Sequence, residues 1–377
     1  MPIDLGLPRR ETKLGTGHRG FAVDTDPDLD LPTAAARRDF TINAIYLDPL
    51  TGEVADPCGG LGDLARRVLR HTGPAFAEDP LRVLRGMQLV ARFDLEPDPA
   101  TVAVCRAMDT EGLPAERLFE EWRKLIVLGA TPSRGLRFLE ATGWLRHYPE
   151  LAALQGVAQD PRHHPEGDVW VHTLHAMDAF ADERLGDPWE DLVVGLAVLG
   201  HDLGKVERTT VEQDGRIRSI GHEQASVVGL RSFLQRLTDH RRLLAQVEPL
   251  VLEHGKPQQL FTAGASDAAV RRLADRVGRI DRLVRVARAD FGGRPPLPRG
   301  FPAGDWLLER AAALGVLCGK PAPLVQGRHL VALGATPGVG FASLLGACYE
   351  AQLAGSITTE AEGLALARRL LQDGAGD

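Results

Sequence analysis

Apolar residues recur with the spacing of an α-helix along most of the chain after residue 60. In the segment 79–93, for example, Leu81, Leu84 and Leu89 fall on one side of a helix. Further amphipathic helices are predicted over 118–128, 134–144 and 360–371. This period restricts the chain to a mainly α protein, in which most helices bury one face against a neighbour.

Signals typical of β-strands are confined to the front of the chain. They predict strands at 21–23, 41–47 and 53–55. Two segments rich in Pro, Gly or charged residues separate the helical regions. The run 160–168 predicts a loop that enters a new domain, and 292–304 predicts a linker.

Composition excludes several classes of protein. The 377 residues allow two to four domains, and the net charge of -7 provides no global basic field for nucleic acid. The four cysteines form no CxxC pair, so we expect neither a zinc ribbon nor a disulfide framework. No apolar stretch has membrane-spanning length, and the N-terminus has no signal-like core, so we expect a cytoplasmic protein without membrane contact.

Six spaced histidines and aspartates are candidate ligands of a divalent metal. They are His172, His201, Asp202, His222, His254 and Asp290. Several of them extend apolar helical stripes, and a buried polar group needs a partner, which a metal can provide. Mixed imidazole and carboxylate ligands suit Mg²⁺, Mn²⁺ or another first-row transition metal. The alternative is a set of hydrogen-bonded core histidines.

This spacing resembles the HD phosphohydrolase superfamily, in which the adjacent pair His201–Asp202 matches the defining doublet. The resemblance implies hydrolysis of phosphomonoesters or phosphodiesters at a metal-bound centre, with His201 and Asp202 in catalytic positions. Lys205, one turn past the doublet, is expected to contact a substrate phosphate, or else to be a solvated cation at a helix end.

A second motif contains Asp79 and Arg82, which share one face of the predicted helix. A carboxylate and a guanidinium could together read the hydrogen-bonding edge of cytosine or adenine. The alternative is an acidic helix cap with a local ion pair.

The segment 37–93 resembles the class II tRNA nucleotidyltransferase (CCA-adding) and bacterial poly(A) polymerase family. The matching motifs are RRD at 37–39 and EDPLR at 78–82, and the run 15–21 matches the mobile loop of that family. The resemblance implies CTP and ATP as substrates of a complete head and RNA 3′ ends, tRNA above all, as partners. It also implies a nucleotide-binding role for Arg37, Arg38, Asp39, Asp79, Arg82 and Arg85.

The chain departs from that family at its start. Asp4 matches the third catalytic carboxylate, yet the Gly-Gly motif and the Asp-x-Asp metal pair that precede it in the family are absent. We therefore expect an incomplete polymerising head. The acidic run 24–30 is a poor substitute, because it follows the mobile loop.

Together these resemblances predict four parts. They are a remnant of an α/β nucleotidyltransferase head at 1–58, a helical neck at 59–150, a helical HD domain at 151–295 and a helical tail at 296–377. Two functions follow: an RNA 3′-end processing protein with a phosphohydrolase site, or a stand-alone phosphohydrolase whose head remnant binds RNA or nucleotides. Whether a complete head would add CC, A or CCA, and the oligomeric state, stay open.

Overall fold

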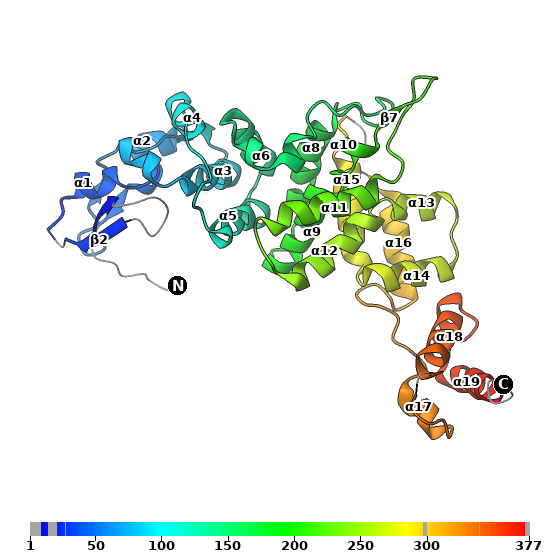
Figure 1. Cartoon of the computed structure of the whole chain (residues 1–377). Helices are drawn as coiled ribbons and strands as arrows, with labels where there is room; N and C mark the ends of the chain where they lie inside the picture. Colours follow the sequence, from blue (N-terminus) through cyan, green and yellow to red (C-terminus); the bar gives the residue numbers. More distant parts are fainter. Residues whose placement is uncertain (1–8, 14–20, 27, 297–299, 339, 374–377) are drawn as a thin grey trace.

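Helices dominate the molecule, as predicted. The computed structural model describes residues 9–13, 21–26, 28–296, 300–338 and 340–373. Within these residues the chain forms an elongated array of helices, with the small strands near the N-terminus at one end and the tail at the other (Figure 1). Among the described residues, no helix combines the length and the apolar character that crossing a bilayer requires.

The front of the chain contains short paired strands. Antiparallel pairs join β1 (Arg9–Lys13) to β2 (Phe21–Thr25) and β3 (Tyr46–Leu47) to β4 (Val54–Ala55). The strands predicted at 21–23 and 53–55 are therefore present. The strand predicted over 41–47 is wrong in its first half, because Thr41–Asn43 forms a 3-10 helix. There the Thr41 hydroxyl donates to the buried Asp63 carboxylate, an interaction that the apolar pattern of the segment could not reveal.

Further short elements lie on either side of α3 (Leu81–Phe93) in the sequence. They are α1 (Leu31–Ala36), α2 (Gly60–Ala65), the parallel pair β5 (Val68–Leu69) and β6 (Glu96–Pro97), and the 3-10 helix η2 (Pro74–Glu78).

Three amphipathic helices form the next layer. They are α3 (Leu81–Phe93), α5 (Ala115–Leu128) and α6 (Pro132–Ala141), and the shorter α4 (Pro99–Arg106) precedes α5. The three predicted helices of this region are thus confirmed to within a few residues at each end. Gly135 of α6 lies against the backbone of α3 at Met87, where an added Cβ would collide. A glycine at this point allows the two helices to pack closely.

The candidate metal ligands lie on a bundle of longer helices. Its members are α8 (Val169–Asp182), α9 (Pro188–Gly200), α11 (His222–Gln235), α12 (Arg241–Glu253) and α15 (Ile280–Gly292). Local sequence fixes where two of them begin. Asp168 caps α8 by accepting from the Val171 amide, and Asp187 caps α9 by accepting from Trp189 and Glu190.

Shorter elements complete the bundle and the tail. They are η3 (Trp144–His147), α7 (Pro149–Ala152), α10 (Lys205–Arg208), the hairpin β7 (Thr210–Val211) with β8 (Ile217–Arg218), α13 (Lys256–Thr262), α14 (Asp267–Val277), α16 (Pro302–Ala313), α17 (Gly327–Ala332), α18 (Gly340–Ala354) and α19 (Glu360–Asp373). The final helix agrees with the one predicted over 360–371.

One continuous hydrophobic core runs from Phe40 to Val316 and joins the neck helices to the bundle that carries the candidate metal ligands. Trp122 of α5 packs edge-on against Phe233 of α11, with ring centroids 5.1 Å apart. The tail has a smaller core of its own around Leu330 and Cys348. The continuous core crosses the predicted limits at 58, 150 and 295, and these domain limits stay a prediction.

The contact between α5 and α9 gives a first testable prediction. A Cβ at Gly195 of α9 would collide with Ile126 of α5 and Phe180 of α8. We expect Gly195→Ala to lower the free energy of unfolding by about 1–3 kcal/mol, measured by urea denaturation. Gly346→Ala in α18 is the control, because a Cβ there meets nothing within 4 Å. It should be neutral or stabilising by about 0.5–1 kcal/mol, and an equal loss in both variants would contradict the packing argument.

Candidate functional site

The structure brings all six predicted metal ligands together; we call this group the His/Asp cluster. His172 comes from the first turns of α8, and His201 and Asp202 directly follow α9. His222 opens α11, His254 directly follows α12, and Asp290 lies near the end of α15. His172, His201 and Asp202 are at most 2% exposed, so the cluster lies inside the helical bundle.

The Nδ1 atoms of the four histidines point away from the centre of the cluster. Those of His201, His222 and His254 lie 2.7, 2.8 and 2.8 Å from backbone carbonyl oxygens three residues earlier in the chain. A carbonyl oxygen only accepts, so each of these Nδ1 atoms donates its proton. The Nε2 atom of the neutral ring then carries a lone pair directed into the cluster.

These Nε2 atoms face one another. The His172 and His201 Nε2 atoms are 3.3 Å apart, and those of His222 and His254 are 3.4 Å apart. Two lone pairs at such a distance repel unless a proton or a cation lies between them. The arrangement therefore favours a metal over a set of hydrogen-bonded core histidines.

Asp202 connects the two halves of the cluster. Its Oδ2 atom lies 3.3 Å from His201 Nε2, and its Oδ1 atom lies 3.3 Å from His222 Nε2. Both oxygens are buried, and neither contact has the geometry of a hydrogen bond. Lys205 pairs with only one of these oxygens, 2.8 Å from Oδ2, and a divalent cation would satisfy the buried carboxylate more fully.

The potential ligand atoms form two adjacent groups, each with its atoms within 4.8 Å of one another. They are His172, His201 and Asp290, and Asp202, His222 and His254. Asp290 approaches His172 Nε2 to 3.2 Å. The donor set of imidazole nitrogens and carboxylate oxygens fits a divalent transition metal, as the sequence predicts.

The pKa values show how strongly the cluster attracts positive charge. Burial lowers the pKa of His254 to about 4, with a further contribution from His201, so this ring is neutral near pH 7. Burial opposes charge on His222 as well, but the Asp202 carboxylate outweighs it and raises the pKa of His222. The carboxylates therefore demand a proton or a metal cation beside them.

Two cations border the cluster. The Lys205 ammonium lies 2.8 Å from Asp202 Oδ2 and donates to the Gln159 side chain at 2.7 Å. Lys205 is only 9% exposed, so it is not a solvated cation at a helix end. The Arg294 guanidinium donates to Asp290 Oδ1 at 3.0 Å.

The two motifs of the predicted nucleotide site contact each other. Arg37 pairs with Glu78 at 3.2 Å, and the Arg82 guanidinium donates to the Arg37 carbonyl at 2.7 Å. Arg85 donates to Asp39 at 2.6 Å. The structure thus joins RRD and EDPLR, which are about forty positions apart in the sequence.

The local ion pair considered for Asp79 and Arg82 is not what the structure shows. Asp79 accepts from Arg117 of α5 at 3.0 Å and from the Leu81 amide at 3.1 Å. Arg82 also donates to the Ala75 carbonyl at 2.7 Å. Arg38 is exposed, and its guanidinium lies 5.8 Å from the centre of the Tyr46 ring. Nucleotide binding by these residues stays a prediction.

Asp4 and positions 15–20 of the predicted mobile loop lie outside the described residues.

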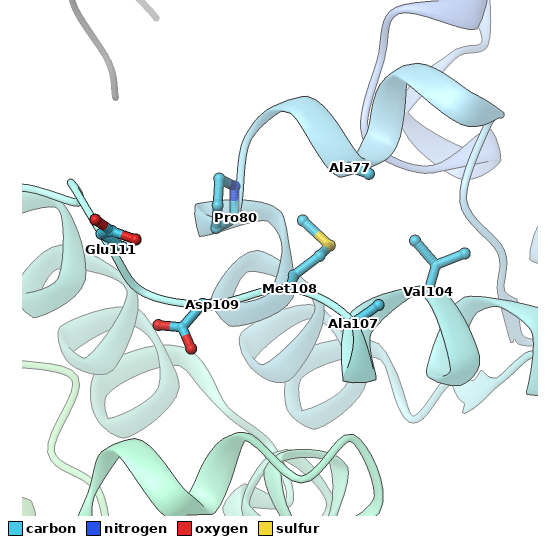
Figure 2. A pocket seen from close by; sticks show the side chains of 7 residues that line it. All are labelled: Ala77, Pro80, Val104, Ala107, Met108, Asp109 and Glu111. Atoms are coloured by element: carbon cyan, nitrogen blue, oxygen red, sulfur yellow. The ribbon is translucent and has the colours of Figure 1, made fainter. Parts of the chain in front are cut away.

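A shallow cavity of about 410 Å³ opens beside the EDPLR motif (Figure 2). Its lining is mostly apolar, with two carboxylates, and consists of Ala77, Pro80, Val104, Ala107, Met108, Asp109 and Glu111. Pro80 belongs to the motif itself, so the cavity adjoins the predicted base-reading residues.

Three residues that contact the predicted sites were not predicted from the sequence. Glu166 and Gln159 contact His172 and Lys205 at the His/Asp cluster, and Arg117 contacts Asp79 of the nucleotide motif. Burial alone would raise the pKa of Glu166, but hydrogen bonds with His164 and His172 lower it to about 2. The available signal was a Glu six positions before His172, in a segment interpreted only as a loop. Gln159 and Arg117 gave no comparable signal, since their partners are distant in the sequence.

The front of the chain matches two known families. Residues 14–70 match the family described as "Poly A polymerase head domain", and residues 94–155 match "Probable RNA and SrmB- binding site of polymerase A". These matches cover the strand-containing region and most of the neck. Both matches are to parts of nucleotidyltransferases of the poly(A) polymerase class.

Curated relatives extend the similarity through the helical bundle. A protein named "Multifunctional CCA protein" from Xanthomonas campestris pv. campestris (strain B100) is 46% identical over 332 residues, covering 83% of this chain and 78% of the relative. A protein of the same name from Stenotrophomonas maltophilia (strain R551-3) is 40% identical, covering 83% and 79%. The chain therefore belongs to the multifunctional CCA protein family, as the sequence predicts.

Solved structures share the fold. The CCA-adding enzyme of Bacillus stearothermophilus, in complex with CTP, has a TM-score of 0.61 at 21% identity and covers 94% of this chain and 78% of its own. The Thermotoga maritima CCA-adding enzyme, in complex with a tRNA, has a TM-score of 0.52 at 18% identity, covering 97% and 82%.

The geometry of the His/Asp cluster predicts stabilisation by metal. Free Mn²⁺ at 100 times its Kd should raise the free energy of unfolding by about 2.7 kcal/mol. The measurement is thermal unfolding of the protein with and without a chelator. His201→Ala should abolish this gain, because it removes an inward Nε2 atom. His175→Ala on α8 is the matched control, since His175 belongs to none of the metal-ligand groups among the described residues. Equal stabilisation in all three proteins would refute the site.

Proposed function

We propose that this protein processes the 3′ ends of tRNA and that its His/Asp cluster is a metal-dependent phosphohydrolase centre of the HD type. The observation that supports the second part is that four Nε2 atoms and two carboxylates form two adjacent groups of potential metal ligands, most of them buried. The name of the relatives and the CTP and tRNA complexes of the shared fold support the first part. A cytoplasmic location, which the sequence predicts, fits this role.

The residues of the cluster have separate tasks in such a reaction. A bound divalent cation polarises a phosphoryl oxygen and lowers the pKa of a bound water. The four imidazoles, Asp202 and Asp290 would hold Mg²⁺, Mn²⁺ or another transition metal. Mn²⁺ suits the nitrogen-rich donor set better than Mg²⁺, which prefers oxygen ligands.

Lys205 would bind the phosphate of the substrate. Its ammonium already lies against Asp202, and its second partner, Gln159, is neutral. A cation fixed at the edge of the cluster would neutralise charge that develops on a phosphoryl oxygen. His201 and Asp202, as ligands, would position the reacting water.

The nucleotide-binding role falls to the contact between RRD and EDPLR. Asp79 offers an acceptor and Arg82 offers donors, a pair that fits the amino group and ring nitrogen of cytosine or adenine. Arg37, Arg38, Asp39 and Arg85 would hold the same region in shape. Asp4 would contribute a carboxylate to nucleotide transfer in a complete head.

A stand-alone phosphohydrolase that uses the head region only for binding is the second candidate. The buried and fully assembled His/Asp cluster favours it, because that site needs no residue from the head. Comparing hydrolysis with nucleotide addition on the same purified protein would distinguish the two functions.

The role of Lys205 gives a prediction for hydrolysis. The Mn²⁺-loaded protein should hydrolyse a phosphomonoester and a 2′,3′-cyclic nucleotide, and Asp202→Ala should abolish both activities together with metal binding. Lys205→Met should keep the metal and lower kcat about 10²–10³-fold, as expected for the loss of one charge-stabilising donor. Lys256→Ala is the control, because Lys256 contacts only Gln259 in an exposed pair among the described residues. An unchanged kcat in Lys205→Met would exclude Lys205 from the reaction.

The EDPLR motif gives a prediction for nucleotide choice. We expect the chain to bind CTP and ATP in preference to UTP and GTP, as measured by equilibrium dialysis of labelled nucleotides. Arg82→Ala should reduce this preference about tenfold to hundredfold, because it leaves the partner group unpaired at a cost of about 1–3 kcal/mol.

Arg92→Ala serves as the control for nucleotide choice. Arg92 lies on the same helix α3 and donates to Gln88, away from the motif. If Arg82→Ala keeps the preference for CTP and ATP, EDPLR does not read the base and only holds the head against the neck.

A further inference from the structure

The loop 160–168 supplies a side chain, Glu166, that contacts one of the candidate metal ligands. The Glu166 side chain is fully buried, although it lies in an irregular connection just before α8. Its Oε1 atom lies 2.8 Å from His172 Nδ1. His172 is one of the six residues of the His/Asp cluster, so Glu166 lies directly behind a candidate ligand.

Glu166 differs from the groups behind the other three histidines. His201, His222 and His254 each direct Nδ1 at a backbone carbonyl oxygen, which helix geometry supplies in each case. His172 Nδ1 has a charged side chain as its partner. A carboxylate holds the Nδ1–H tautomer more strongly than a carbonyl and makes Nε2 a better donor to a metal.

The same Glu166 oxygen has a second imidazole partner. His164 Nδ1 also lies 2.8 Å from Oε1, and the His164 and His172 rings meet edge-on with centroids 4.9 Å apart. The other oxygen, Oε2, is buried and has no hydrogen-bond partner. Such an incompletely satisfied buried carboxylate is expensive, which is typical of a functional site.

We propose that Glu166 is a positioning residue that fixes His172 as an Nε2 ligand and thereby sets the metal affinity of the cluster. This inference rests on the proposed metal centre. The loop 160–168 would then have a functional role, because it supplies the carboxylate that holds His172. In this role Glu166 would act through His172 Nδ1 and would not itself be a ligand of the metal.

The test measures metal affinity in the full-length protein. Mn²⁺ binding is followed by competition with a chelator, and Co²⁺ absorption reports the coordination of the ion. Glu166→Ala should weaken Mn²⁺ binding about tenfold to hundredfold, the usual effect of removing the partner of a ligating histidine. It should also change the Co²⁺ spectrum, because His172 can rotate or change tautomer. Glu166→Gln keeps an acceptor oxygen and should restore part of the affinity.

His164→Ala is the matched control. It removes the other partner of the same oxygen but leaves the contact between Glu166 and His172, so Mn²⁺ affinity should stay within about threefold of wild type. Unfolding in chelator shows whether each variant is folded. Glu166→Asp keeps the buried charge but withdraws the oxygen, so it replaces Glu166→Ala if the alanine variant does not fold, with the same weakening expected.

Two results would overturn the assignment. The first is wild-type affinity in Glu166→Ala, which would mean that His172 needs no carboxylate. The second is an equal loss in His164→Ala, which would mean that general loop packing sets the affinity. A wild-type protein that binds neither Mn²⁺ nor Co²⁺ would instead refute the metal centre itself.

Discussion

The buried carboxylate of Asp202 is the constraint around which the helical bundle is arranged. It lies between His201 and His222, with Lys205 alongside, and neither oxygen has a hydrogen bond. A charge at such a depth is tolerated only if positive charge surrounds it. Five helices end, begin or turn at this point, so a single electrostatic requirement fixes where α8, α9, α11, α12 and α15 must meet.

The neck packs directly against this bundle within one continuous hydrophobic core. The absence of a side chain at Gly195 lets α9 approach Ile126 of α5, and Trp122 packs on Phe233 across the same boundary. The region that matches the RNA-binding segment of the family and the helices that carry the His/Asp cluster therefore share one hydrophobic core. The tail, with a separate small core, is less constrained.

Sequence periodicity predicted the helices because each buries one apolar stripe, and it pointed to His172, His254 and Asp290 because they lie on or extend such stripes. The pair His201–Asp202 was indicated by its place at a helix end, and His222 by the family resemblance. It failed at 41–47, where a buried hydrogen bond between Thr41 and Asp63 overrides strand propensity. It also missed Glu166 and the pairing of Asp79 with Arg117. Those contacts join side chains from irregular segments or from segments far apart in the sequence. Hydrophobic periodicity carries no information about which of these side chains meet.

The position of Arg82 has a consequence for how a nucleotide would be exchanged. Its guanidinium donates short hydrogen bonds, each 2.7 Å long, to the carbonyl oxygens of Ala75 and Arg37. A base that recruits this arginine must displace both, so the net free energy of recognition is only the difference between old and new bonds. If Arg82 reads a base as proposed, recognition by exchange would be selective while remaining weak, and a bound nucleotide would be released rapidly. The carbonyl oxygens of Ala75 and Arg37 would then compete with the base for the Arg82 guanidinium.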